Sequence, residues 1–186
     1  MRRVTTRCYG LRTRSPTLVA YPGRMGFEGA VRRAGVDDAA TVARLLHDFN
    51  TEFDTPSPGP DVLAERLRRL LGPTAATSGG GTTAHLAEDA GGAPLGLALV
   101  TWHPNVWYDG PVALLDELYV VPTRRGGGVG AALLAAVVDE AGRVGAGAIE
   151  LGADEPDVDA LRFYGRHGFV GGFEPGERSF FLQREL

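Results

Sequence analysis

The sequence predicts an α/β protein of the α+β type, with a mixed, mostly antiparallel sheet of six to seven strands flanked by four helices in the order β-α-α-β-β-β-α-β-α-β-β. Short β-branched runs alternate with stretches whose apolar residues recur at helical spacing. At residues 115–134 an apolar strand runs into a glycine-rich turn that opens directly into a helix. With 186 residues, 44% of them hydrophobic, and no internal repeat, the chain is expected to form one domain.

The first half of the chain supplies the outer strands and a pair of helices. A proline-rich loop at 53–60 separates the two helices, and a flexible connector at 74–81 leads back to the sheet. In chain order we expect a strand at 29–34, a helix capped by Asp37 or Asp38 and reaching Phe49, a helix at 62–71, and strands at 82–88 and 93–102.

The second half contains the central strand and ends the sheet. A loop at 103–111 precedes the central strand. We expect strands at 114–121, 148–153, 169–173 and 178–184, with helices at 129–141 and 158–167 between them.

The N-terminal residues and the charge of the chain indicate which kinds of protein and partner to expect. Residues 1–28 are expected to be a flexible extension and residues 29–186 the domain, because residues 1–24 hold six arginines and no acid. That composition resembles a transit peptide, and a start codon placed too far upstream is the alternative. Subtracting the six arginines of residues 1–24 from the net charge of −4 leaves −10 on the rest of the chain, which argues against nucleic acid and for a cationic or neutral substrate. A single cysteine, Cys8, fits a reducing cytoplasm, and no stretch is long enough to span a membrane.

The turn Arg125-Gly126-Gly127-Gly128-Val129-Gly130 is suited to binding an anion. Glycines let a ligand approach the backbone amides, which point the same way as the unpaired N–H groups of the following helix. The helix dipole adds about half a positive charge, so phosphate or pyrophosphate fits best, and Arg125 would add a cation. A Walker-type loop needs a lysine, which this chain lacks entirely, and the glycine offsets of the dinucleotide fingerprint fail.

Two motifs give the chain a family resemblance. Arg125, Gly128 and Gly130 match Arg/Gln-x-x-Gly-x-Gly/Ala, the acetyl-CoA pyrophosphate loop of the GCN5-related N-acetyltransferases (GNAT). Residues 160–169, ALRFYGRHGF, resemble the family's Ala-x-x-Phe-Tyr-x-x-x-Gly-Phe. The order of elements over about residues 29–186 is similar as well, so the resemblance implies the GNAT fold. The chain departs from the family at Asp157, where an asparagine usually contacts CoA.

The resemblance implies acetyl-CoA as co-substrate and no metal. The pantetheine arm would lie along the central strand, one strand amide would donate to the reacting oxygen, and Tyr164 would protonate the departing sulfur. The residues implied to bind the cofactor are Leu118, Tyr119, Val120, Arg125, Gly126, Gly127, Gly128, Val129, Gly130, Ala131, Asp157 and Tyr164.

Asp116 and Glu117 are the candidate bases. An aliphatic amine has a pKa of about 10.4, so removing its proton at neutral pH costs roughly 4–5 kcal/mol. Polyamine acetyltransferases of the family carry an acidic pair at this strand position. Neighbours on a strand face opposite sides, so we expect only one of the two to reach the amine, and we favour Glu117. For each residue the alternative, a solvated or structurally paired carboxylate with no catalytic role, stays equally open. Trp102, Trp107 and Tyr108 could form an aromatic wall for a cationic substrate, or a strand-edge core.

The sequence therefore predicts an enzyme, an acetyl-CoA-dependent N-acetyltransferase acting on a primary amine of a small cationic molecule by direct attack in a ternary complex. An aminoglycoside 3-N-acetyltransferase is the nearest alternative, and a CoA-binding module without catalysis is the alternative from another class. Acetylation of a protein N-terminus or lysine is less favoured. We expect a cytoplasmic protein with a small-molecule partner, no nucleic acid and no membrane, and leave a homodimer open.

Overall fold

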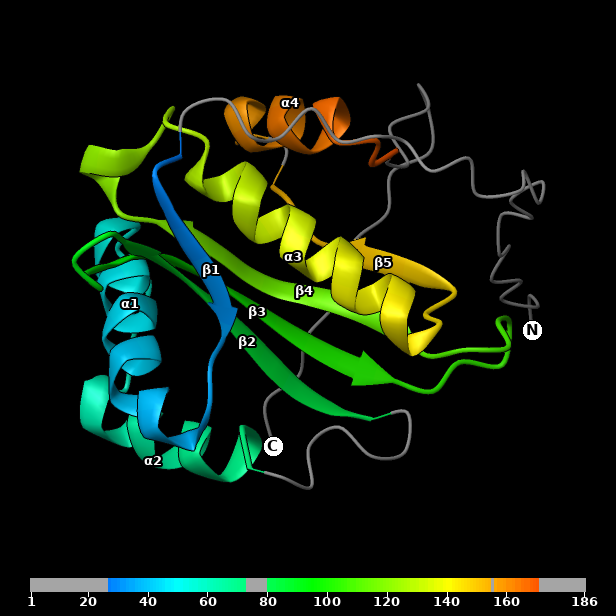
Figure 1. Ribbon diagram of the computed structural model, residues 1–186, viewed down its shortest axis with the longest axis horizontal. Coiled ribbons are helices and arrows are strands. Elements are labelled where there is room, and N and C mark those ends of the chain that lie inside the picture. Colours follow the sequence, from blue (N-terminus) through cyan, green and yellow to red (C-terminus); the bar gives the residue numbers. More distant parts are fainter. Residues whose placement is uncertain (1–26, 73–79, 155, 171–186) are drawn as a thin grey trace, which may run out of the picture.

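The structure, a computed structural model of the chain, describes residues 27–72, 80–154 and 156–170. These residues form one sheet whose strands follow one another in chain order from edge to edge (Figure 1). The first four strands are antiparallel, and the fifth runs parallel to the fourth. The strands are β1 (Gly29–Arg33), β2 (Gly81–Asp89), β3 (Pro94–His103), β4 (Val112–Val120) and β5 (Ala148–Leu151).

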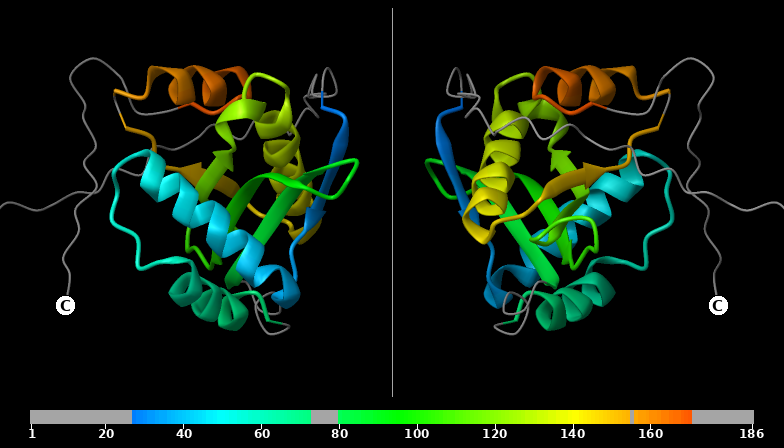
Figure 2. Two further views of the ribbon diagram at one scale, coloured as in Figure 1. Left: turned by 90° about the vertical axis from the view of Figure 1, so that its left-hand side faces the viewer. Right: turned by 90° about the vertical axis from the view of Figure 1, so that its right-hand side faces the viewer.

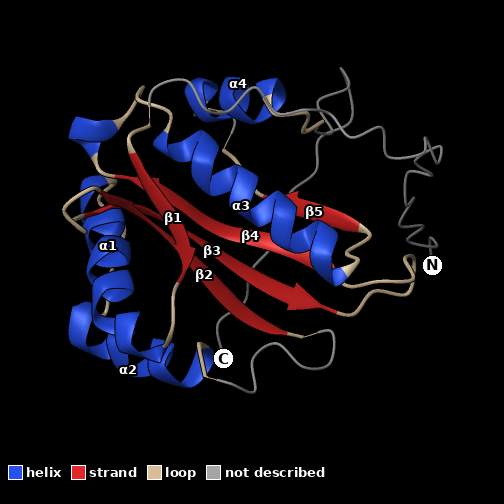
Figure 3. Cartoon of the chain, viewed as in Figure 1, coloured by secondary structure: helices blue, strands red, loops and turns tan. Residues whose placement is uncertain are grey.

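The helices cover both faces of the sheet. The helix pair α1 and α2 lies on one face, and α3 lies across the other with α4 beyond it (Figures 1 and 2). The α-helices are α1 (Ala39–Glu52), α2 (Pro60–Leu70), α3 (Val129–Val144) and α4 (Val158–Arg166), and the short 3-10 turns are η1 (Val36–Asp38) and η3 (Pro122–Arg124). Figure 3 shows the mixed helix and strand arrangement that the sequence predicts.

Two hydrophobic cores lie on the two faces. Under α1 and α2, residues such as Val42, Leu45 and Leu67 pack on Leu86 and Leu97 of the sheet. Under α3, a second cluster joins helix residues to the opposite faces of the strands; its members include Val129, Leu133, Leu134 and Val137 together with Ala98, Val100, Trp102, Ala113 and Leu115. The central strands β3 and β4 are thus covered on both faces.

Each helix boundary has a local cause. Pro60 occupies the first turn of α2, where its missing N–H costs nothing. Helix α3 begins after Gly128, with φ of 86°, and ends at Gly145, with φ of 70°, both in the left-handed region that glycine tolerates best. Asp38 stands at the N-cap of α1 as expected, yet its carboxylate does not cap that helix. It accepts instead from the Gly35 N–H at 2.8 Å.

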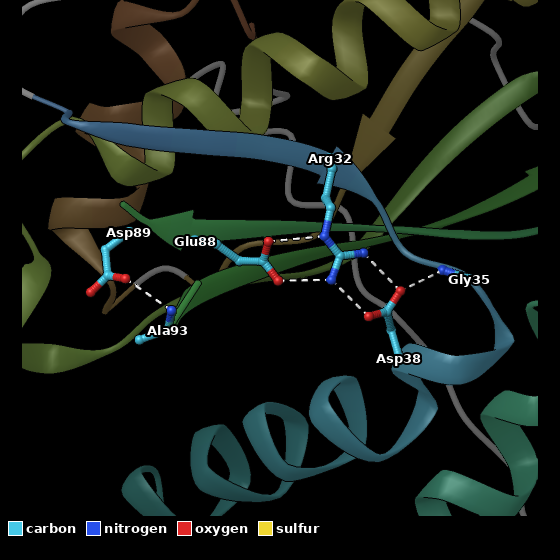
Figure 4. A network of polar contacts seen from close by, with 6 residues as sticks. All are labelled: Arg32, Gly35, Asp38, Glu88, Asp89 and Ala93. Atoms are coloured by element: carbon cyan, nitrogen blue, oxygen red, sulfur yellow. Dashed lines mark hydrogen bonds and ion pairs between the residues drawn. The ribbon is translucent and has the colours of Figure 1, made fainter. Parts of the chain in front are cut away.

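The Asp38 carboxylate also belongs to an ion-pair network at the edge of the sheet (Figure 4). Arg32 of β1 donates to both oxygens of Asp38, at 2.8 and 2.7 Å, and to both oxygens of Glu88 in β2, at 2.9 and 2.7 Å. Next to it, Asp89 accepts from the Ala93 N–H at 2.9 Å and closes the β2–β3 turn. The network ties the first strand to the start of α1.

A polar network also lies within the core under α3. Glu140 of α3 is only 3% exposed. It accepts from the Thr83 hydroxyl at 3.2 Å and lies 3.2 Å from His85 Nε2. Thr83 in turn accepts from Trp102 Nε1 at 3.0 Å. Burial is the main cause that lowers the pKa of His85.

Strand β4 contains a bulge at Asp116. Glu117 pairs with Leu99, but the next residue of β3, Val100, pairs with Leu115, so Asp116 is the extra residue. A bulge changes which face the following side chains occupy. Ala113 and Leu115 before it and Leu118 after it all belong to the core under α3.

The predicted order of elements is confirmed from the first strand through α4, with bounds that differ by a few residues. The two final strands, expected at 169–173 and 178–184, lie outside the described residues except for Phe169 and Val170, which are in no strand. The described part of the sheet therefore has five strands rather than six or seven. Phe27 packs against the core under α3, so the packed domain starts before residue 29. Within these same ranges, no helix has the length and apolarity to cross a membrane.

Candidate active site

The glycine-rich turn follows β4 and leads into α3. Pro122–Arg124 form one 3-10 turn, after which Gly126 and Gly128 adopt φ of 76° and 86°. A side chain is strained at such angles, so the path of the backbone depends on glycine at these two positions.

The first turn of α3 presents free backbone donors. Its first intrahelical bond runs from the Ala132 N–H to the Gly128 carbonyl at 3.0 Å. The N–H groups of Val129, Gly130 and Ala131 therefore have no partner within the helix. Gly130 faces Phe163 of α4 and Val120 of β4, with ordinary contact distances of 3.6 Å from a Cβ placed there. This arrangement fits an anion such as the pyrophosphate of acetyl-CoA.

Arg125 does not offer the free cation that the sequence suggested. Its Nη1 and Nη2 donate to the two carboxylate oxygens of Glu52, at the end of α1, at 2.7 and 2.8 Å. Its Nε donates to the Val120 carbonyl at 3.0 Å. The charge of Arg125 is thus balanced inside the protein, and hydrogen bonding to Arg125 lowers the pKa of Glu52.

Within the described ranges, the end of β4 has one open edge. The Val121 N–H donates to the Leu95 carbonyl of β3 at 3.0 Å. Backbone groups of successive residues in an antiparallel pair point alternately toward the partner and away from it, so those of Leu118 and Val120 point away from β3. On that side β5 pairs with β4 only from Val112 to Leu115.

The open edge narrows the set of strand residues that could bind a ligand. The N–H groups of Leu118 and Val120 lie where a ligand could pair with them. Tyr119 does not: its backbone points to β3, and its side chain, 4% exposed, packs in the core under α1. Of the three strand residues expected to contact the cofactor, Tyr119 is therefore the one whose backbone and side chain both face the protein.

Asp116 and Glu117 lie on the same face of β4, not on opposite faces as expected. Leu115 and Leu118 on either side of them both pack under α3, so the bulge leaves the two carboxylates to the face of α1. Asp116 accepts from the Thr101 hydroxyl at 2.6 Å. Glu117 has no hydrogen bond or ion pair to its carboxylate within the part of the chain that the structure describes. Burial, and next the charge of Asp116, raise the pKa of Glu117.

Tyr164 approaches this region from α4. Its ring packs edge-on against Phe163 and Phe169, at centroid distances of 5.2 and 5.7 Å. Burial, followed by the charges of Asp157 and Glu117, raises the pKa of Tyr164 to about 12. Its hydroxyl therefore keeps its proton at neutral pH, as a general acid must.

Asp157 is the N-cap of α4. Its Oδ1 accepts from the Ala160 N–H at 3.0 Å, a role that aspartate and asparagine fill equally well. The departure from the family's asparagine therefore preserves the start of this helix.

The aromatic wall expected from Trp102, Trp107 and Tyr108 does not form. Trp102 is 7% exposed and belongs to the core under α3, on the face opposite Asp116 and Glu117. Trp107, 70% exposed, and Tyr108 lie in the loop before β4. Tyr108 packs so closely on Gly147 that no side chain would fit there.

Sequence reasoning missed two polar partners of the site. Glu52 binds Arg125, and Thr101 binds Asp116. Each is distant in sequence from its partner, so no local pattern could have identified it.

Comparison with known proteins agrees with this geometry. The family model for the acetyltransferase (GNAT) family matches residues 42–169. A candidate acetyltransferase from Arthrobacter sp. FB24 is similar in structure, with 48% identity, a TM-score of 0.70, and coverage of 84% of this chain and 96% of that one.

More distant structures share the fold. A ribosomal-protein-alanine N-acetyltransferase from Brucella melitensis biovar Abortus 2308 has 21% identity and a TM-score of 0.65, covering 84% of this chain and 99% of that one. An aminoglycoside acetyltransferase from an uncultured soil metagenomic sample has 18% identity and a TM-score of 0.64, covering 84% and 97%. No curated protein matches the chain significantly. On the family model and its two sequence motifs, the chain belongs to the GNAT family of acetyltransferases.

Proposed function

We propose that the protein is an acetyl-CoA-dependent N-acetyltransferase that modifies a primary amine of a small cationic substrate by direct attack in a ternary complex. One observation carries the proposal furthest. Glu117 is a half-buried carboxylate with no hydrogen-bond partner among the described residues, and it lies next to the open edge of β4, which leads into the turn before α3.

The residues of the chain divide the work as follows. The turn at 126–131 would hold the pyrophosphate, and the open edge at Leu118 and Val120 would hold the pantetheine arm. Acetyl-CoA supplies the acetyl group as a thioester. The N–H of Leu118 or Val120 would donate to the carbonyl oxygen as negative charge develops on it.

Two side chains would move the protons. Glu117 would take a proton from the ammonium group of the substrate, through water, and its raised pKa brings it closer to the operating pH. Tyr164 would donate its hydroxyl proton to the sulfur that leaves as the amide bond forms. Asp116 accepts a hydrogen bond from Thr101 and would not take the proton itself. Its negative charge would help to raise the pKa of Glu117 and would make this face of β4 more acidic.

The acidic pair supports a cationic acceptor. Two carboxylates on one face of β4 favour an ammonium group over a neutral or anionic substrate. Two relatives suggest acceptors to include in a test, namely aminoglycosides, since a related structure holds sisomicin, and peptides that begin with alanine. At 18% and 21% identity neither is preferred over other cationic amines.

The test is a screen for amine-dependent release of the CoA thiol, with polyamines, aminoglycosides and alanine peptides as acceptors. We expect at least one cationic amine to raise the rate well above hydrolysis, and Glu117→Gln to lower it at neutral pH. Exposed Glu65 of α2, changed to glutamine, is the matched control. Tight acetyl-CoA binding with no acceptor-dependent release from any amine would instead support the CoA-binding module without catalysis.

A further inference from the structure

The ion pair between Glu52 and Arg125 joins two distant parts of the chain. Glu52 is the last residue of α1, and Arg125 is the residue immediately before the three consecutive glycines. The guanidinium meets both carboxylate oxygens, at 2.7 and 2.8 Å. The end of α1 approaches the turn after β4 at this point (Figure 1).

A third bond ties the same guanidinium to the end of β4. Arg125 Nε donates to the Val120 carbonyl at 3.0 Å. That carbonyl points to the open edge of β4, because the adjacent Val121 N–H points to β3. The guanidinium also lies 5.8 Å from the centroid of the Tyr119 ring, within the range of a cation–π contact. One side chain therefore fixes both the strand end and the residue at which the glycine turn begins.

The glycines themselves cannot fix the turn. A glycine loses more conformational freedom on ordering than any other residue, so three in a row make an ordered loop costly. Binding a ligand at such a loop would include this cost unless the loop is already held in place. The turn is anchored on its far side by α3 and on its near side by Arg125.

We propose that Glu52 is a positioning residue for the cofactor loop: by holding Arg125 it orders residues 126–128 before acetyl-CoA binds. This inference rests on the proposed function, since it assumes that the turn binds acetyl-CoA. Glu52 would not touch the cofactor. An exposed ion pair contributes little to stability in general, but a bidentate arginine–carboxylate pair is geometrically specific, and this one acts directly before three consecutive glycines.

The experiment measures acetyl-CoA affinity of the full chain by calorimetry, at a temperature where every variant is folded. We expect Glu52→Gln to weaken binding by roughly 3- to 10-fold, while the KM for the amine barely changes. Hydrogen exchange of the amides of residues 126–128, measured without ligand, should become faster in the same variant. Glu65→Gln, which removes a carboxylate from an exposed pair on α2, is the matched control and should change neither.

A double-mutant cycle shows whether Glu52 acts through Arg125. In that case, combining Glu52→Gln with Arg125→Gln should weaken binding no more than Arg125→Gln alone. Additive losses, or unchanged affinity and unchanged exchange in Glu52→Gln, would overturn the inference while the wild type still binds acetyl-CoA. Absence of acetyl-CoA binding by the wild type would instead refute the proposed function.

Discussion

Gly128 is the position where the turn that we propose binds acetyl-CoA depends most directly on glycine. It stands at the N-cap of α3 with φ of 86° and ψ of −5°. For any other L-residue the left-handed region costs roughly 1–2 kcal/mol. Gly128→Ala therefore forces a choice between a strained native turn and a displaced one.

The two outcomes differ in what they change. If the turn keeps its path, the strain appears in folding, where the lower entropy of the unfolded alanine chain offsets about 0.4–1 kcal/mol of it. If the turn shifts in the free protein, acetyl-CoA must restore it on binding. The same 1–2 kcal/mol then weakens the affinity by roughly 5- to 30-fold. We expect the second outcome, because the neighbouring glycines let the turn move.

Gly130→Ala is the matched control, two residues along the same helix. A Cβ there would lie 3.6 Å from Phe163 and Val120, at ordinary contact distance. Since alanine is the better helix former by about 1 kcal/mol, we expect an unchanged or higher Tm and unchanged affinity. Calorimetry with acetyl-CoA and thermal melts compare the two variants. Equal affinities of both variants and the wild type, or equal losses in both, would refute the argument from the backbone angle.

Three further predictions concern other parts of the structure. Tyr164→Phe should lower kcat by roughly 100-fold and leave the Kd of acetyl-CoA unchanged. The variant removes a hydroxyl whose pKa is raised to about 12 and keeps the packed ring. Weakened acetyl-CoA binding at full kcat would contradict the role of Tyr164 as a general acid. Asp116→Asn should move the acidic limb of the kcat/KM pH profile to lower pH. The proposed base, Glu117, works deprotonated, and the charge of Asp116 adds to burial in raising its pKa. An unmoved limb would mean that Glu117 is not the base. Glu140→Ala should destabilise the fold by about 1–3 kcal/mol, a fall in Tm of roughly 3–10 °C, because Thr83 and His85 lose a buried acceptor. Exposed Glu65→Ala should stay within about 0.5 kcal/mol, and equal melts of the two variants would contradict this.

The features that sequence predicts well here are those with local causes. The turn at Gly126–Gly128 and the helix after it follow from glycines beside an apolar run of helical spacing, and both are present. The helix expected at 158–167 has a local cause too, and it is present as α4. The pairing of Glu52 with Arg125 joins positions 73 residues apart in sequence, and only the folded chain brings them together.

The side of the sheet on which Trp102 lies could not be predicted from strand alternation, for a different reason. Alternation along a strand predicts which residues share a face, and Trp102 does share one with Ala98 and Val100. It does not say which face meets solvent or ligand when helices cover both sides, as they do for β3. An aromatic residue at the end of such a strand is therefore as consistent with core as with a binding surface, and here it is core.

The bulge at Asp116 explains both the wrong facing of the acidic pair and the shape of the site. Strict alternation would place Asp116 and Glu117 on opposite faces, but one extra residue reverses the alternation, so both face α1. Nothing in β4 alone reveals this, because the bulge exists only against the register of β3. The β4–β5 pairing ends at Leu115, directly before the bulge. The same irregularity brings two like charges together, which adds to burial, the larger cause, in raising the pKa of Glu117. It coincides with the point where the edge at Leu118 and Val120 becomes open. The acidic pair and the strand amides of Leu118 and Val120 therefore lie next to one another, at and after the bulge, on the half of β4 that leads into the glycine-rich turn.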